Sequence, residues 1–269
     1  MGFKPKNHYS FSQISTFKSC REQYKLVYFE GIRKKSESIE AFMGKCVHAT
    51  LEWLYQKENI AKPYLTFDSI CTKYDDIWVG SWHKDIFIAD VRMGSDNYYS
   101  IGKRCLSNYY HKYGPTFDEY VVGTELALDF RMDGKYHFRG VIDRLDRPKP
   151  GRYVIHDYKT GKHPLTVNSA KNNLQLVIYH LCVQEKFDDV KDITLTWHFL
   201  RQGVEVSIHH SADEMIKFKK KLKKQVDQIV DLTSDSGNFY PKESILCNWC
   251  YYWQECSAKT TGNPVRRAE

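Results

Sequence analysis

Hydrophobic residues recur at helical spacing through the first third of the chain. Ser10 or Ser12 can cap a first helix, because a serine oxygen accepts a hydrogen bond from a free amide of the first turn. A second helix is predicted over 41–58, and further helices over 64–113 with a break near Gly94-Ser95. Their apolar positions are Ile14, Phe17, Tyr24 and Tyr28 in the first helix and Phe42, Val47, Leu51, Leu54 and Tyr55 in the second.

The pattern changes near residue 118 to shorter runs that are typical of strands. Asp133-Gly134 stands between two such runs and is a strong hairpin signal. The strands are predicted at 119–131, 136–146, 153–159, 192–200 and 204–210, and the later helices at 166–187 and 212–233. Helices followed by this βββαββα order predict a layered α/β or α+β domain.

Three regions are expected to fold as one compact unit. A helical N-terminal region covers 1–117, the strand-rich core covers 118–234, and a cysteine-rich cap and tail cover 235–269. The length of 269 residues suits one large domain with a small appendage.

Composition narrows the class of protein. Apolar residues make up 42% and charged residues 27%, which is typical of a globular chain. No apolar run approaches the roughly 18 residues of a membrane span, and the N-terminal sequence lacks the apolar stretch of a signal peptide. We therefore expect the cytoplasm, where the eight cysteines are better metal or cluster ligands than disulfide partners. The net charge of +7 is compatible with a nucleic-acid partner but does not require one.

Carboxylates gather around one predicted hairpin. Asp157 and Lys159 stand two apart on a strand, so both side chains point to the same face. Asp143 lies near the end of the preceding strand and Glu125 one strand earlier. Carboxylate oxygens bind Mg²⁺ or Mn²⁺, and a nearby lysine can orient water, so phosphodiester hydrolysis would suit this set. The competing interpretation is ordinary surface charge, because D-x-K alone is common.

The residues around Asp143, Asp157 and Lys159 favour the catalytic interpretation over ordinary surface charge. The stretch GVIDRLDRPKPGRYVIHDYKTGK at 140–162 resembles the core motif of the PD-(D/E)XK nuclease superfamily, and more narrowly its RecB-like branch. Asp143, Asp157 and Lys159 match the acidic positions and lysine of that motif. The resemblance implies a restriction-endonuclease-like fold, with a central mixed sheet flanked by helices.

Further segments are similar to the same branch. Gln175 and Tyr179 match its Q-L-x-x-Y helix motif, which implies contacts to water or the scissile phosphate. Gly44 and His48 match its G-x-x-x-H motif, which implies a metal ligand or phosphate contact at His48. Glu125 stands where the branch has an upstream acidic residue. An imidazole ligand would favour Mn²⁺ somewhat over Mg²⁺.

Four cysteines form a second set. Cys247, Cys250 and Cys256 lie within ten residues, and Cys20 stands far upstream. Thiolates are suitable ligands for an iron–sulfur cluster, and the resemblance implies that these four hold a [4Fe–4S] cluster that ties the first helix to the C-terminus. A structural Zn²⁺ ion is the alternative, since C-x2-C is also typical of zinc sites.

Six lysines crowd eight residues of the last long helix. Lys217, Lys220, Lys221 and Lys224, with Lys219 and Lys223, would cover its solvent side. They either form an ordinary solvated face or follow the phosphates of DNA.

These features predict a metal-dependent DNA nuclease, with exonuclease action on single strands or free ends as the favoured form. No P-loop is present, so a helicase or recombination partner, or an already opened end, would be needed. A homo-oligomer and a phage, CRISPR or DNA-repair context are compatible with the resemblance. Two alternatives stay open: a non-catalytic DNA-end-binding or scaffold subunit, and a zinc-stabilised nucleic-acid-binding protein.

Overall fold

A five-stranded mixed sheet forms the centre of the computed structural model, which describes residues 8–62, 64–117, 120–234, 239–258 and 266–267. The sheet has the order β3-β4-β5-β6-β7. Its strands are β3 (Val121–Met132), β4 (Tyr136–Lys149), β5 (Arg152–Lys159), β6 (Asp192–Phe199) and β7 (Val204–Ile208). Within this sheet, β5 and β6 run parallel and the other neighbouring strands pair antiparallel. The predicted α/β class, a mixed sheet flanked by helices, is confirmed.

The hairpin between β3 and β4 forms at the predicted turn. Asp133 and Gly134 both have positive φ angles, of 53° and 63°, as the central residues of a type I′ turn require. Leu128, Phe130 and Met132 are buried and alternate with exposed residues. The long hairpin therefore has one apolar face against the core and one face toward solvent.

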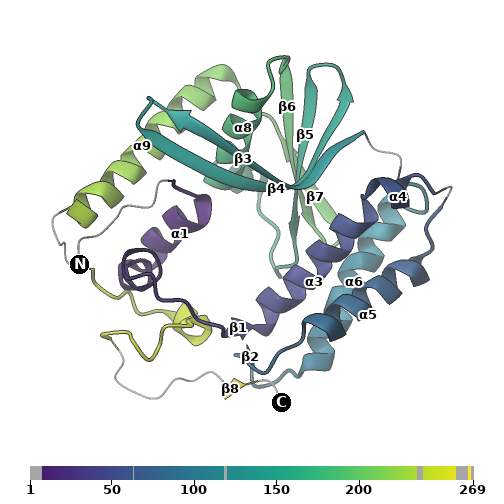
Figure 1. Cartoon of the computed structure of the whole chain (residues 1–269), viewed down its shortest axis with the longest axis horizontal. Coiled ribbons are helices and arrows are strands. Elements are labelled where there is room, and N and C mark those ends of the chain that lie inside the picture. The colour runs from purple at the N-terminus through teal and green to yellow at the C-terminus, as the bar shows by residue number, and fades with distance from the viewer. Residues whose placement is uncertain (1–7, 63, 118–119, 235–238, 259–265, 268–269) are drawn as a thin grey trace.

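Three helices cover this apolar face and complete the larger hydrophobic core (Figure 1). They are α1 (Phe11–Ser19), α8 (Leu174–Lys186) and α9 (Ala212–Ser234), with the short α7 (Val167–Lys171) before α8. The predicted helix over 166–187 is wrong in one respect: it is two helices, because α7 ends at Lys171 and the Asn173 side chain caps α8.

A second helical layer packs on the other face of the sheet around its own core. It contains α3 (Ile39–Leu54), α4 (Lys57–Ile60), α5 (Phe67–Ser81) and α6 (Ser95–Tyr113). The predicted helix over 41–58 is likewise divided, since α3 ends at Leu54, with Tyr55 as its C-cap, and α4 follows. Gly94 caps α6, so the predicted break at Gly94-Ser95 is confirmed.

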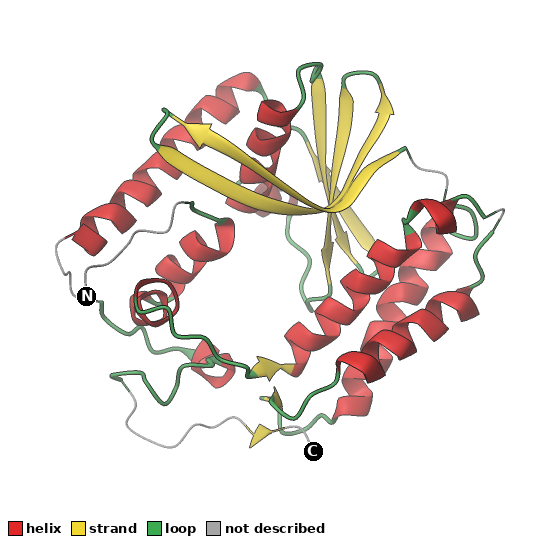
Figure 2. Ribbon diagram, in the orientation of Figure 1, coloured by secondary structure: helices red, strands yellow, loops and turns green. Residues whose placement is uncertain are grey.

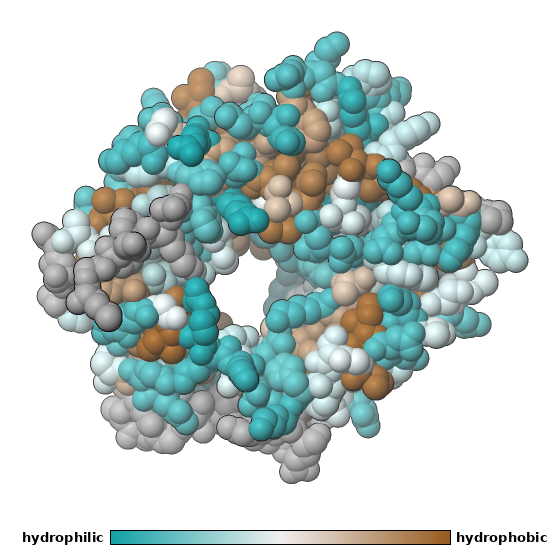
Figure 3. Space-filling view, viewed as in Figure 1, coloured by the Kyte–Doolittle hydropathy of each residue, from teal (hydrophilic) through white to brown (hydrophobic). Residues whose placement is uncertain are grey.

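The remaining segments join the two layers at the lower edge in Figure 2. They comprise α2 (Arg21–Tyr24), the π-helical turn η1 (Lys25–Phe29), β1 (Glu37–Ser38), β2 (Ile86–Ile88), the 3₁₀ turn η2 (Ile245–Trp249) and β8 (Arg266–Arg267). The chain thus forms a ring around a central opening, bordered by α3, α1, the C-terminal segment and the β3–β4 end of the sheet (Figure 3). Within the described residues, no helix combines the length and apolarity needed to cross a membrane.

Candidate active site

The predicted catalytic residues meet where β3, β4 and β5 approach α3 and α8. Asp157 is 1% exposed, and its carboxylate lies 2.5 Å from the Lys159 ammonium. The two residues share a face because side chains two apart on β5 point the same way. Asp143 reaches the same place from β4, where its Oδ2 accepts a 2.7 Å hydrogen bond from the Tyr158 amide.

Three candidate metal ligands lie together beside this pair. One ligand atom each from His48, Glu125 and Asp143 falls within 4.8 Å of the other two. His48 comes from α3, so a helix far from the hairpin in sequence completes the group. One nitrogen and two carboxylate oxygens form a donor set suited to Mn²⁺ or Mg²⁺. A cavity of about 370 Å³ opens at this group and is lined by Gly44, Lys45, His48, Ala49, Glu52 and Glu125.

The backbone of Tyr158 holds two of these ligands. Its amide donates to Asp143, and its carbonyl oxygen lies 3.0 Å from Nε2 of His48. A carbonyl can only accept, so Nε2 of His48 carries a proton and Nδ1 is the free nitrogen in the neutral ring. Nδ1 faces Asp143 Oδ1 at 3.6 Å. A proton on Nδ1 can therefore be donated to Asp143, and in the neutral ring Nδ1 is the nitrogen left to bind a metal ion.

Glu125 has a strained backbone that the sequence did not reveal. Its φ angle is +44°, in the left-handed region that residues other than glycine rarely adopt. Such strain costs of order 1–3 kcal/mol and tends to occur at functional sites. Glu125 is exposed, but its partial desolvation, with a contribution from Asp143, raises its pKa. The bend places the Glu125 carboxylate in the group with His48 and Asp143.

A chain of hydrogen bonds connects α8 to the lysine. The Lys159 ammonium donates to Oε1 of Gln175 at 3.1 Å, and Nε2 of Gln175 donates to the Tyr179 hydroxyl at 2.9 Å. Burial raises the pKa of Tyr179 strongly, and Asp157 adds to this, so the phenol stays neutral. Gln175 stands in the first turn of α8, which begins at the Asn173 cap. The cap therefore sets where this chain meets the sheet.

The electrostatics of the site follow from the shared burial of its charges. Burial, with a contribution from Asp143, raises the pKa of Asp157 to about 6 against the attraction of Lys159. At His48, burial lowers the pKa, but the hydrogen bond and charge of Asp143 outweigh it and the net pKa is raised. A cation entering the group would relieve the repulsion between these carboxylates.

Two motif glycines have a packing reason that sequence alone did not show. A Cβ at Gly140 would lie 2.7 Å from the Tyr179 ring, and a Cβ at Gly44 would lie 3.3 Å from Oγ1 of Thr160. Gly140 thus lets α8 approach β4, and Gly44 lets α3 approach the end of β5. The glycine three residues before Asp143 was the available signal.

The match to a known family decides the assignment. The model of the PD-(D/E)XK nuclease superfamily matches residues 8–257, which include every residue of this site. The chain belongs to the PD-(D/E)XK nuclease superfamily. Nucleases of this superfamily are metal-dependent hydrolases, in keeping with the acidic group at His48, Glu125 and Asp143.

One solved structure shares the fold of this chain. A protein of Eubacterium rectale described as a "Putative exonuclease" is 12% identical, with a TM-score of 0.56 over 96% of this chain and 91% of that chain. A structure described as SSO0001 is 14% identical and covers 93% and 96% of the two chains, but its TM-score of 0.33 carries no argument. No curated protein sequence matches this PD-(D/E)XK chain.

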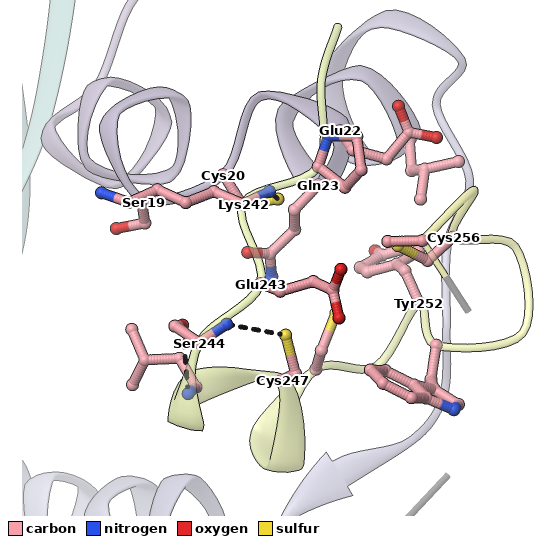
Figure 4. Close-up of a pocket in the computed structure, with 16 residues that line it drawn as sticks. Ser19, Cys20, Glu22, Gln23, Lys242, Glu243, Ser244, Cys247, Tyr252 and Cys256 are labelled. Carbon is pink, nitrogen blue, oxygen red and sulfur yellow. Dashed lines mark hydrogen bonds between the residues drawn. The ribbon is translucent and has the colours of Figure 1, made fainter. Parts of the chain in front are cut away.

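The four predicted cluster cysteines of this nuclease line one cavity of about 50 Å³ (Figure 4). Cys20 lies between α1 and α2, Cys247 within η2, and Cys250 just after η2, with Cys256 beyond it. Backbone amides approach two of the sulfurs, since the amides of Lys242 and Ser244 lie 3.5 Å from Sγ of Cys20 and Cys247. The fold therefore brings Cys20 to the distant C-terminal three.

The lysines of α9 lie elsewhere. All six are exposed, as the amphipathic pattern of the helix predicted. Lys223 is paired with Asp227 at 2.9 Å. Figure 1 places α9 at the outer edge, with α3 on the other side of the central opening. Lys217, Lys220, Lys221 and Lys224 are therefore not gathered at the candidate metal group.

Proposed function

We propose that this chain is a RecB-like, divalent-metal-dependent deoxyribonuclease that degrades DNA from single-stranded ends. The observation that carries the proposal is the meeting of His48, Glu125 and Asp143 beside the buried Asp157–Lys159 pair. These are the residue types that hold a metal ion and orient water next to a phosphate. All stand at positions that match the motifs of the branch.

Each residue has a proposed role. Asp143 and Asp157 hold Mg²⁺ or Mn²⁺, and His48 and Glu125 complete or flank its ligands. When bound, the metal would polarise the phosphate and lower the pKa of a coordinated water. Lys159 stands 2.5 Å from Asp157 and 3.1 Å from Gln175, so it can orient the attacking water between them. Gln175 and Tyr179 then direct this lysine and contact the phosphate.

The preference for ends is supported by the central opening. The site cavity lies between α3 and β3, and both elements border the opening (Figure 3). A single strand passed through the ring would meet the metal group, whereas a closed circle cannot be threaded. The similarity to the Eubacterium rectale protein shows the fold alone, but its description as an exonuclease agrees with this proposal.

The cysteines are proposed to hold a [4Fe–4S] cluster. A single zinc ion, with Zn–S bonds of about 2.3 Å, would draw four sulfurs to roughly 3.8 Å of one another. Among the described residues, the set of three candidate ligand atoms within 4.8 Å is the His48 group, which contains no cysteine. The four thiols line one shared cavity, and the five-residue gap before Cys256 together with the distant Cys20 favours a cluster over a zinc ion.

Other proposed interactions are less tied to the site. The α9 lysines would track the phosphates of DNA outside the ring, with a helicase or recombination protein supplying opened strands. The exposure of these lysines supports this role but fits a solvated helix face equally. A DNA-end-binding subunit without activity and a zinc-stabilised nucleic-acid-binding protein are the alternatives, and the presence of Lys159 beside Asp157 favours the enzyme.

The deciding experiment uses anaerobically purified protein with end-labelled linear and circular single-stranded DNA, with Mg²⁺ or Mn²⁺. We expect metal-dependent loss of linear DNA only, abolished by Lys159→Ala. Cleavage of circular DNA would support the nuclease activity but contradict the proposed preference for ends. If the wild-type protein is folded and has the brown colour of an iron–sulfur cluster but cleaves neither substrate, the chain is instead a non-catalytic DNA-end-binding subunit.

A further inference from the structure

A buried polar cluster lies directly behind the candidate active site. Arg144 follows Asp143 on β4, so strand alternation points it to the opposite face of the sheet, where it is 1% exposed. His156 precedes Asp157 on β5 in the same way and is the cross-strand partner of Arg144. Each of the two core carboxylates therefore has a buried polar neighbour on the reverse face.

Arg144 contacts residues of β4, β5 and α6 and the tyrosine that follows α3. Its guanidinium donates to the Tyr109 hydroxyl at 2.8 Å, forms an ion pair with Asp146 at 3.0 Å, and lies 4.0 Å from the centre of the Tyr55 ring. Tyr55 is the C-cap of α3, the helix that bears His48, and Tyr109 belongs to α6. The Asp146 carboxylate also lies 3.0 Å from His156. One arginine thus joins the sheet to both helices.

Tyr158 carries this cluster through to the site. Its hydroxyl lies 3.4 Å from that of Tyr109, and the two rings meet edge to face at 5.6 Å. Its own backbone holds Asp143 through the amide and His48 through the carbonyl. A shift of the Tyr158 ring would therefore move the hydrogen bonds that orient both ligands.

We propose that Arg144 and Tyr109 are positioning residues for the metal site, acting through Tyr158. Buried ion pairs add little net stability compared with well-packed apolar residues, so stability alone does not account for the cluster. The cluster does fix the distance between α3 and the strands β4 and β5. Groups that contact metal ligands from behind set the orientation of those ligands. This inference rests on the proposed metal-dependent function.

The test compares two variants that each lose one buried hydroxyl. Tyr109→Phe removes one hydrogen-bond acceptor of Arg144, whereas Tyr74→Phe removes a hydroxyl that contacts the Tyr99 carbonyl at 3.4 Å in the same helical layer. In metal-free protein we expect the Tyr158 amide to exchange hydrogen severalfold faster in Tyr109→Phe than in Tyr74→Phe. We also expect Mn²⁺ to bind about tenfold more weakly, as measured by calorimetry without DNA.

Arg144→Lys provides a second test, because it keeps the charge but loses the planar donor set. It should weaken Mn²⁺ binding in the same direction. Tyr158 exchange and Mn²⁺ affinity in Tyr109→Phe equal to those of the Tyr74→Phe control would overturn the inference, even if the wild type is an active nuclease. A wild type that binds Mn²⁺ but cleaves no DNA would instead refute the proposed function. If the wild type binds no Mn²⁺, the exchange of the Tyr158 amide alone decides whether Tyr109 positions it.

Discussion

Lys159 contacts both the proposed metal ligand Asp157 and Gln175 of α8. Its removal should therefore affect the rate of cleavage and the affinity for metal differently. In Lys159→Ala, we expect kcat to fall by about 10²–10⁴, because one positioned proton-transfer or charge-stabilising group is lost. Mn²⁺ affinity should not weaken, since a neighbouring positive charge has gone. Single-turnover cleavage and calorimetry measure the two quantities, with Lys186→Ala at the far end of α8 as control. A loss confined to metal affinity would contradict the role given to Lys159.

Glu125 allows its backbone strain to be measured separately from its carboxylate. Both Glu125→Gly and Glu125→Ala should lose the same Mn²⁺ affinity, because both remove the ligand. Glycine accepts a φ of +44° without the steric cost of about 1–2 kcal/mol that alanine bears. We therefore expect the glycine variant to be more stable by about 1 kcal/mol in urea unfolding. Equal stabilities would show that the bend relaxes at no cost.

At the scale of elements, α8 touches β4 through Gly140 and Tyr179. Gly140→Ala would place a methyl group 2.7 Å from the Tyr179 ring, so α8 must shift. We expect a loss of about 1–3 kcal/mol in stability, as overpacked cores show, and a weakened Gln175–Lys159 contact that lowers kcat. Thermal unfolding and kinetics measure both. Gly80→Ala is the control, because a Cβ there meets nothing within 4 Å.

The burial of α8 also predicts a pH dependence of stability. Burial, aided by His210 and Lys219, lowers the pKa of His180 from 6.5 to about 4. Between pH 6.5 and pH 4, His180 is protonated in the unfolded chain but neutral in the folded chain. The free energy of unfolding therefore decreases as pH falls through this range, by ~3 kcal/mol at most. His180→Leu should flatten that part of the curve. Parallel curves for the variant and the wild type would contradict the assignment.

At the scale of the whole molecule, the C-terminal segment 239–258 contacts the N-terminal region and so closes the ring. The Tyr252 hydroxyl donates to the Ile32 carbonyl at 3.1 Å, and Lys34 pairs with Glu255. If the four cysteines hold a cluster, Cys250→Ser should bleach the protein and speed proteolysis within 239–258. Cys71→Ser, in α5, should do neither. Colour and protection unchanged in Cys250→Ser would refute the cluster assignment.

The sequence by itself determined the class of fold and the residue types of the site. Alternation, helical spacing and the Asp133-Gly134 turn are local, so they could be recognised without the partner elements, although the Asn173 cap that divides one helix was missed. Asp157 and Lys159 could be placed on one face because a strand has a period of two. The family motifs added His48 and Cys20, which no local pattern would join to the core.

Only the tertiary structure decided how these residues meet. The left-handed bend at Glu125, the double use of the Tyr158 backbone and the cluster around Arg144 depend on packing between α3, α6 and the sheet. Nothing in the sequence distinguished Arg144, because an arginine in a strand is usually in contact with water. It becomes unusual only because the folded structure buries it. Long-range contacts set that burial, and the motif around Asp143 contained no information about what would lie behind it.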